Sequence, residues 1–114
     1  MVLMLTAPVL PGRAEAWRRM CQELLGSRAE RFSASACRLG VRSQRIWLVP
    51  MPRGELAVIW LDVANPDRAL ADLATSDAPF DRWLRRQLQH LIGVDLTVPV
   101  ETNGELVLEW IKEA

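Results

Sequence analysis

The sequence has little of the chemistry that metal and cofactor sites use. It contains one histidine, His90, and two cysteines, Cys21 and Cys37, with no Cys-x-x-Cys pair. A single histidine beside two separated cysteines does not make a zinc site. No glycine-rich loop follows an apolar run, so a phosphate-cradling nucleotide loop is not present. We expect no metal and no cofactor, with His90 as the one histidine that a haem could use.

Net charge is lacking as well. Fourteen basic residues balance fourteen acidic ones, which removes the simplest argument for nucleic acid or an anionic membrane as a partner. Proline, arginine or aspartate interrupts every apolar run well before the roughly 18 residues that a transmembrane helix needs. The apolar N-terminus also lacks the basic residues that begin a signal peptide. We therefore expect a cytoplasmic chain with no membrane or nucleic-acid partner.

The charges that are present are unevenly distributed along the chain. From Arg13 to Arg53, nine arginines accompany three glutamates, whereas from Asp62 to Glu113 ten acidic residues accompany five basic ones. This polarity would let the two halves of the chain, or two copies of it, attract each other. It would equally give an anionic ligand a positive rim to bind.

Apolar runs predict the order of elements in a single domain that spans residues 1–114. A chain of this length, half of it hydrophobic, supports one core rather than two. Apolar, β-branched runs predict strands, and apolar residues repeated at helical spacing predict helices. The predicted strands cover Val2–Leu10, Ile46–Met51, Leu56–Leu61 and Leu106–Ile111, and the helical stripes run from Trp17 to Leu39 and from Ala69 to Ile92.

Several residues mark where the predicted helices begin and end. Gly40 and Gly93 follow the two stripes, and glycine commonly ends a helix in the left-handed conformation. Asn65-Pro66 is a start signal, because a capping side chain precedes a proline suited to the first helical position. Gly26-Ser27 should kink or end the first helix, with the serine capping a second segment. The polar residues 75–77 should interrupt the second stripe in a similar way.

The resulting order, β-α-β-β-α-β, predicts an α+β fold with a four-stranded antiparallel sheet and both helices on one face, the ferredoxin-like arrangement. Residues 46–49 and 58–61 are apolar at successive positions, so they present apolar groups to both faces of the sheet. Two helices cover only one face, and a second copy of the sheet would cover the other. We therefore expect a homodimer with sheets packed face to face, closing towards a barrel. The sequence does not decide which face Trp47 and Trp60 occupy.

This pattern resembles the dimeric α/β-barrel superfamily, over nearly the whole chain. Within it the layout is similar to that of the rhamnose-mutarotase type and of uncharacterised small bacterial barrel proteins. Residues 16–21 and 75–83 carry the likeness, as an aromatic-bearing first helix and a Ser-Asp before an aromatic-rich second helix. Cys21 stands where the mutarotase type has its catalytic histidine. Because a thiol does not shuttle protons as an imidazole does near neutral pH, the resemblance does not carry that activity over.

The resemblance implies a ligand pocket between the helices and the sheet. Trp17 and Cys21 are four residues apart on the first helix, and Trp83, Gln87 and His90 lie along one edge of the second. Aromatic walls with a few polar groups are typical of small-molecule sites, so these residues are the candidate substrate-binding set. His90 is the candidate general acid–base, or it complements the end of its helix. Cys21 is a nucleophile only if its pKa is lowered, and otherwise a small buried hydrophobe.

These observations support two functional hypotheses. The first is a small organic molecule bound beneath the helices, with cofactor-independent proton transfer, isomerisation or monooxygenation as the reaction. The second is a non-catalytic dimerisation or ligand-binding module. A pocket without roughly 300 Å³ of enclosed space favours the second. Asp62, which shares a strand face with Trp60, would be a base if it were partly buried with a raised pKa, and is otherwise exposed at the sheet edge or paired with an arginine.

Overall fold

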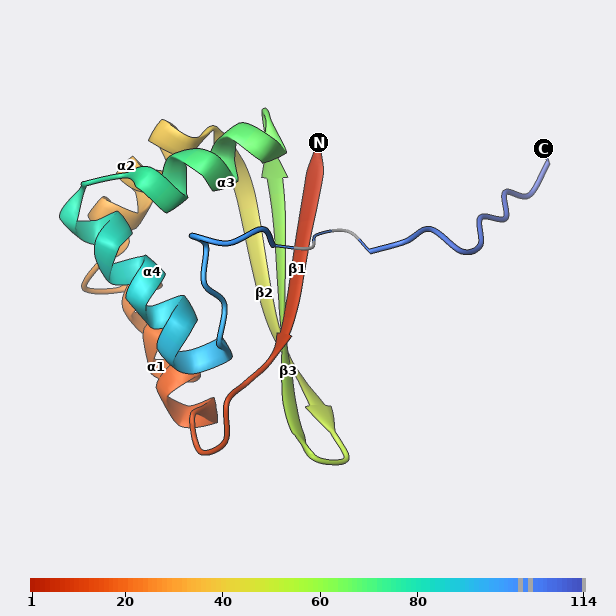
Figure 1. Ribbon diagram of the computed structural model, residues 1–114, viewed down its shortest axis with the longest axis horizontal. Helices are drawn as coiled ribbons and strands as arrows, with labels where there is room; N and C mark the ends of the chain where they lie inside the picture. The colour runs from red at the N-terminus through yellow and green to blue at the C-terminus, as the bar shows by residue number, and fades with distance from the viewer. Residues whose placement is uncertain (101, 103, 114) are drawn as a thin grey trace.

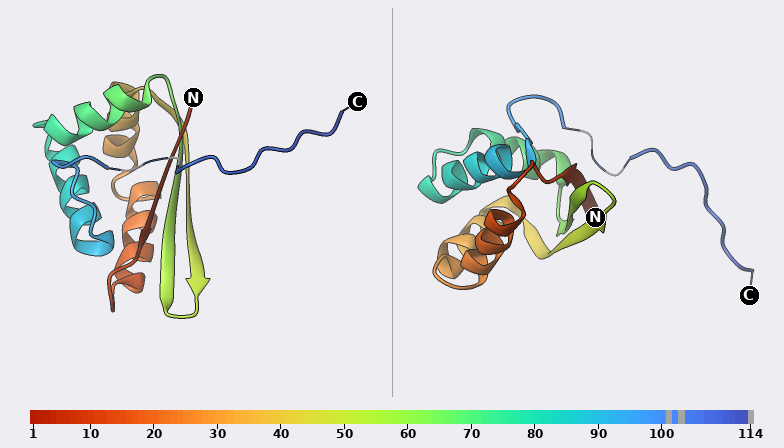
Figure 2. Two further views of the ribbon diagram at one scale, coloured as in Figure 1. Left: turned by 45° about the vertical axis from the view of Figure 1, so that its right-hand side comes forward. Right: turned by 90° about the horizontal axis from the view of Figure 1, so that it is seen from below.

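Three strands and four helices follow one another in the computed structural model, which describes residues 1–100, 102 and 104–113. The strands form one antiparallel sheet in the order β1-β3-β2, and all four helices lie on one side of it (Figures 1 and 2). In chain order the elements are β1 (Val2–Pro8), α1 (Ala14–Leu25), α2 (Ala29–Leu39), β2 (Val41–Met51), β3 (Gly54–Val63), α3 (Pro66–Thr75) and α4 (Pro79–Ile92).

The register of the sheet assigns every strand residue to one of two faces. Leu5 lies opposite Ile59 on β3, and Ile59 lies opposite Ile46 on β2. All three residues belong to the core between the sheet and the helices. Because successive side chains of a strand alternate between faces, this row defines the inner face, and its neighbours along each strand define the outer face. The exposure of β1 alternates at each residue in the way that this geometry requires.

The main core forms where the inner face meets α1 and α4. Apolar residues at helical spacing give each helix one stripe that faces the sheet. The buried members of this core are Leu5, Ala7, Trp17, Met20, Leu24, Ala57, Ile59, Phe80, Leu88, Leu91 and Ile92. A smaller cluster of Leu3, Val63 and Ala69 lies under α3.

Most of the predicted helix signals are confirmed. The Asn65 side chain accepts a hydrogen bond from the backbone N–H of Arg68 at 3.1 Å, and Pro66 is the first residue of α3. Gly40 and Gly93 end α2 and α4 with φ angles of 73° and 66°. These angles lie in the left-handed region that glycine enters at little steric cost.

The predicted order β-α-β-β-α-β is wrong, because each helical stripe is divided into two helices. The order is β-α-α-β-β-α-α. Between α1 and α2 the chain turns at Gly26, and α2 begins after Arg28 rather than after a capping Ser27. Between α3 and α4, Ser76 and Ala78 are extended, and Pro79 begins the next helix. The amphipathic stripe continues across both breaks because each pair of helices faces the same sheet.

The predicted fourth strand is also wrong, and with it the four-stranded ferredoxin-like sheet and the barrel built from it. Residues 106–111 have no regular secondary structure, and their side chains are exposed. Alternating apolar residues suit any extended segment, whereas a strand also needs a partner for its backbone groups. After α4 the chain instead places Val94, Leu96 and Val100 against the core. The sheet is therefore three-stranded across the residues that the structure describes.

The two tryptophans of the hairpin lie on the outer face. Met4 pairs with Trp60, Trp60 pairs with Arg45, and Val58 pairs with Trp47, so these residues share the side away from the helices. Trp47 is 47 % exposed, and Arg45 stacks over the Trp60 ring at 4.7 Å. We use "outer face" for the exposed apolar side chains on this side, which are Val2, Met4, Trp47, Val49 and Met51, together with the half-buried Leu56, Val58 and Trp60.

Neighbouring residues of α4 offer a direct test of this packing. Leu88→Ala should lower the free energy of unfolding by about 2–5 kcal/mol, because it removes a buried side chain and leaves a cavity. Gln89→Ala, one residue further along and exposed, should change it by less than about 0.5 kcal/mol. Chemical denaturation measures both. Equal losses in the two variants would contradict the orientation of α4.

Candidate functional site

A narrow cavity of about 90 Å³ lies between the helices and the inner face of the sheet. Its wall is almost wholly apolar, with Trp17, Ser35 and Gln44 as its polar residues. Trp17 is 1 % exposed, and its indole N–H has no hydrogen-bond partner among the residues that the structure describes. A buried donor without an acceptor is uncommon and costs roughly 1–3 kcal/mol. The cavity thus combines apolar surface with one unsatisfied donor in its wall.

The size of this cavity separates the two functional hypotheses. Pockets for drug-sized ligands enclose about 300–1,000 Å³, and this cavity has about 90 Å³. Such a space admits a few water molecules or a very small organic molecule. It does not hold a substrate that needs several side chains to orient it. By the criterion stated above, the size favours a module that is packed nearly solid.

The five candidate site residues are not gathered around one cavity. Trp17 lines the internal cavity, whereas Trp83 lines a separate groove on the outside of the helix layer. Cys21, Gln87 and His90 line neither of these spaces. Gln87 is half-buried on α4 and makes no side-chain hydrogen bond with the described residues. Helical spacing places residues on a helix face, but it does not show which space in the folded chain each side chain lines.

Cys21 has the environment of a packing residue. Its side chain is half-buried and packs against the core of α1, α4 and the sheet. Burial raises the pKa of the Cys21 thiol, so the thiolate that a nucleophile needs is disfavoured near neutral pH. This agrees with its interpretation as a small buried hydrophobe.

His90 and Asp62, the two acid–base candidates, do not line the cavity. His90 is exposed in the last turn of α4, and it forms no hydrogen bond or ion pair with any residue in the described part of the chain. Its position suits the alternative role of complementing the helix C-terminus. Asp62 accepts a hydrogen bond from the N-terminal ammonium group of Met1 at 3.2 Å and lies 3.9 Å from Arg42. The paired interpretation of Asp62 is confirmed.

The most concentrated polar chemistry is a buried carboxylate that the sequence pattern did not single out. Asp81, near the start of α4, is 0 % exposed. The hydroxyls of Ser35 and Ser76 donate to it at 2.5 and 2.6 Å, and Arg38 donates at 3.0 Å. Burying a carboxylate is costly unless it is paired and hydrogen-bonded, and these three donors meet that requirement. The cluster joins α2, α4 and the segment between α3 and α4.

The ionisation of Asp81 follows from these contacts. Burial acts to raise the pKa of Asp81, while the hydrogen bonds from Ser35, Ser76 and Arg38 and the charge of Arg38 act to lower it. The net result is a lowered pKa, so the carboxylate is ionised at neutral pH and accepts hydrogen bonds from all three groups. An ionised carboxylate that is fully engaged in this way serves as a structural anchor rather than as a proton acceptor.

Helical spacing was the signal that could have located this anchor. Asp81 lies three residues before Leu84 and seven before Leu88, which places it on the buried stripe of its helix. An acid on an apolar stripe requires a donor. Arg85, one turn further along α4, also ties this helix to the end of α3, because it donates hydrogen bonds to the backbone carbonyls of Leu73 and Ser76 at 2.6 and 2.8 Å.

An open groove of about 590 Å³ lies between α2 and α4 on the surface of the helix layer. Phe32 of α2 stacks on Phe80 of α4 with ring centroids 6.1 Å apart, and Trp83 meets Phe80 edge-on at 5.6 Å. These aromatic contacts hold the two helices side by side. The residues that line the groove are Arg28, Arg31, Ala34, Arg38, Ala78, Pro79, Phe80, Trp83 and Arg86.

No protein-family model, curated protein or solved structure matches this chain. In residues 1–100, 102 and 104–113, no three or more histidine, cysteine or acidic side chains cluster in a way that could hold a metal ion. None of the helices in that part of the chain combines the length and hydropathy that crossing a membrane requires. The function has therefore to be inferred from the surfaces and spaces of the fold itself.

The anchoring role of Asp81 predicts a loss of stability in Asp81→Asn. The amide puts an N–H₂ group where Ser76 or Arg38 donates, so the free energy of unfolding should fall by about 1.5–3 kcal/mol. Asp77→Asn, at an exposed position in the segment that precedes α4, is the matched control and should have little effect. Chemical denaturation at pH 7 measures the difference.

The difference between wild type and Asp81→Asn should also depend on pH. Because the folded-state pKa of Asp81 lies below its usual value of 3.8, its contribution is complete above that value and is lost as the pH falls through the folded-state pKa. The difference in stability between the two proteins should therefore begin to shrink below about pH 4 and disappear below the folded-state pKa. A difference that stayed constant down to pH 2 would contradict the ionised anchor.

Proposed function

We propose that this protein is a self-association module without catalytic activity, in which two copies pack through the outer faces of their sheets. The observation that carries the proposal is the apolar character of a sheet face that the helices leave uncovered. Met51, Trp47 and Val2 are 51 %, 47 % and 44 % exposed. Monomeric proteins rarely expose a large contiguous apolar patch, and such patches commonly mark contacts with another protein.

The C-terminal segment adds apolar surface on the same side of the molecule. This segment, residues 104–113, projects away from the sheet on the side opposite the helices (Figures 1 and 2). Its large apolar side chains, each at least 74 % exposed, are Leu106, Val107, Leu108, Trp110 and Ile111. Leaving this segment and the outer face in water forgoes the free energy of burying them. A second copy covers both when the segment of each lies over the outer face of the other.

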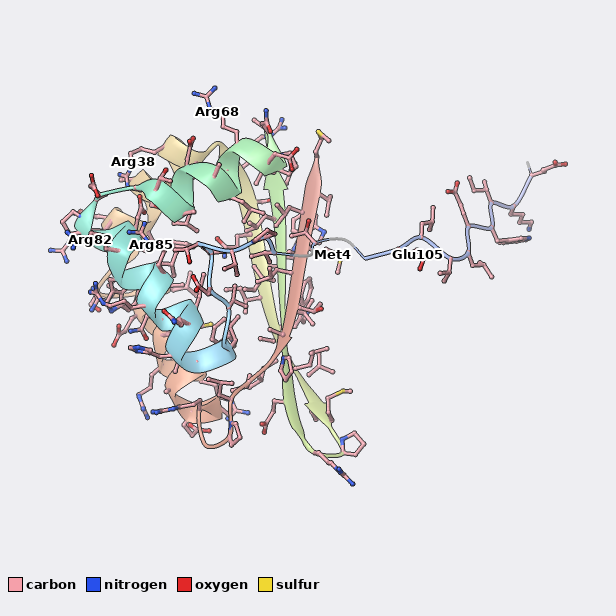
Figure 3. All side chains as sticks on the ribbon, in the orientation of Figure 1. Met4, Arg38, Arg68, Arg82, Arg85 and Glu105 are labelled. Carbon is pink, nitrogen blue, oxygen red and sulfur yellow. The ribbon has the colours of Figure 1, made fainter. Side chains whose placement is uncertain are left out.

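Charge favours the same arrangement. The C-terminal segment carries Glu105 and Glu109, and the outer face carries the exposed Arg45 beside Trp60. Glu105 and Met4 mark the segment and the sheet in Figure 3. Acidic residues on one element and an arginine on the other set a preferred alignment when the apolar surfaces meet.

The absence of catalysis is inferred from how the candidate groups are placed. The buried carboxylate is fully hydrogen-bonded, the half-buried Cys21 thiol has a raised pKa, and the exposed histidine of α4 does not line the cavity. Acid–base catalysis requires a group within hydrogen-bond reach of a bound substrate. The narrow cavity offers no such group beyond the indole of Trp17 and the side chains of Ser35 and Gln44.

Trp47→Lys tests the self-association. The wild-type chain should be a dimer at tens of micromolar, and the variant should be monomeric, because a charge at the centre of an apolar interface has no partner there. Sedimentation or light scattering coupled to size-exclusion chromatography measures the mass. Leu25→Lys is the matched control, since Leu25 is 83 % exposed on α1, in the helix layer. A monomeric wild-type chain, or equal dissociation in the control, would refute the proposal.

A second candidate function, binding of a very small organic molecule in the internal cavity, is favoured by the unpartnered indole N–H of Trp17. An apolar molecule with one acceptor oxygen, such as butanone, matches this wall. Saturating butanone should raise the melting temperature and shift the Trp17 indole N–H resonance. Ala36→Leu, which fills the cavity from its wall, should abolish both effects. If the indole resonance does not move in the wild type, the cavity holds no such ligand.

A further inference from the structure

We propose that the groove between α2 and α4 binds a small phosphorylated organic molecule. The groove has a volume of about 590 Å³, which is within the range of small-molecule sites. It differs from the internal cavity in its chemistry, because four arginines and two aromatic side chains face it. None of the residues that line it carries a carboxylate.

Helical spacing brings the arginines together. Arg28, Arg31 and Arg38 recur at intervals of three and seven residues, which places them along one face of α2. On α4, Phe80, Trp83 and Arg86 recur at intervals of three and line the opposite wall. The groove therefore has a basic wall on α2 and an aromatic wall with one arginine on α4.

Two of the four arginines are already neutralised by carboxylates. Arg28 donates to Glu23 at 3.0 Å, and Arg38 donates to the buried Asp81 at 3.0 Å. Arg31 and Arg86 form no ion pair with any residue in the described part of the chain. The groove thus keeps an excess of two positive charges, which matches the charge of a phosphate monoester near neutral pH.

The paired arginines give the groove a fixed shape. The guanidinium of Arg28 lies 3.9 Å from the centre of the Trp83 ring. It also forms an ion pair with Glu23, so it has two partners that fix its position. Arg38 is held by Asp81, which is itself anchored by two serines. A groove whose walls are ordered beforehand loses less side-chain entropy when a ligand binds. Arg31 and Arg86, which have no ion-pair partner among the described residues, therefore remain to bind the phosphate group of the ligand.

Phosphate is favoured over other anions by both charge and geometry. Guanidinium groups donate paired hydrogen bonds that fit phosphate oxygens. A phosphate ion alone is small beside this groove, so the ligand also has an organic part that contacts the exposed Pro79 and the half-buried Trp83. The ligand is therefore a phosphate ester of an apolar or aromatic group.

The site is separate from the proposed self-association surface. The groove lies on the helix layer, and the outer face lies on the opposite side of the sheet. Figure 3 shows Arg38 at the helix side and Met4 on the sheet. Failure of one proposal therefore leaves the other standing.

Phenyl phosphate is the probe, added to the full-length chain and followed by isothermal titration and by the indole N–H resonance of Trp83. It should bind more tightly than inorganic phosphate, because the ring adds apolar contact, and more tightly than the singly charged benzoate. The double variant Arg31→Gln/Arg86→Gln should weaken binding by about tenfold or more. The control, Arg13→Gln/Arg53→Gln, removes the same charge from exposed positions outside the groove and should bind as the wild type does.

Three results would overturn the site. Equal weakening in the control variant would show attraction to net charge rather than to the groove. Benzoate binding as tightly as phenyl phosphate would remove the assignment of phosphate. The third result is that phenyl phosphate does not bind to the wild type while Arg31→Gln/Arg86→Gln makes the dimer dissociate. The groove would then be a contact surface between two copies of the chain. Unchanged thermal unfolding of both variants confirms that they are folded.

Discussion

The central strand β3 carries apolar side chains on both faces, and the described chain buries only one of them. Ile59 packs beneath the helices with its neighbours on β1 and β2, and this row determines where α1 and α4 lie. The same pleat directs Val58 and Trp60 to the other side, where no helix covers them. The outer face is available for association because this asymmetry leaves it uncovered, whereas the groove lies where α2 and α4 meet on the surface of the helix layer.

Both aromatic and polar contacts join α2 to α4 in the helix layer. α2 and α4 meet through stacked aromatic rings, and the carboxylate of Asp81 then joins them through Ser35 and Arg38. An ion pair with a buried carboxylate, such as Arg38–Asp81, is weak evidence for net stability, since desolvation opposes it. Its effect here is specific: it fixes the rotation of α2, because Arg38 must reach Asp81. The same rotation turns Arg31 to the groove. An interaction that orders the interior therefore also arranges charge at the surface.

Local signals predicted the parts of this fold that depend on neighbouring residues. The two neighbouring strands β2 and β3, the Asn65 cap and the glycine ends of α2 and α4 each depend on a few adjacent residues, and the sequence contains them. The apolar character of both sheet faces was also readable from residues 46–49 and 58–61. The absence of a fourth strand could not be predicted in this way. The apolar pattern of residues 106–111 suits a strand, but it does not show whether these residues come close enough to a sheet edge to pair with it. The Asp81 cluster and the groove join residues that are about 50 apart in sequence, a separation that periodicity cannot bridge.

The two inferred surfaces differ in the physical force on which each depends, and this makes them separable. The outer face gains from removing apolar area from water, an effect that salt strengthens or leaves unchanged. The groove depends on two unpaired guanidinium groups in partly exposed positions, an attraction that salt screens within a Debye length of about 8 Å at physiological ionic strength. Raising the salt concentration therefore weakens ligand binding in the groove without weakening the apolar contribution to association. Since the sheet separates them, a copy that has associated through its outer face still presents the groove to solvent, and association needs no ligand in order to occur.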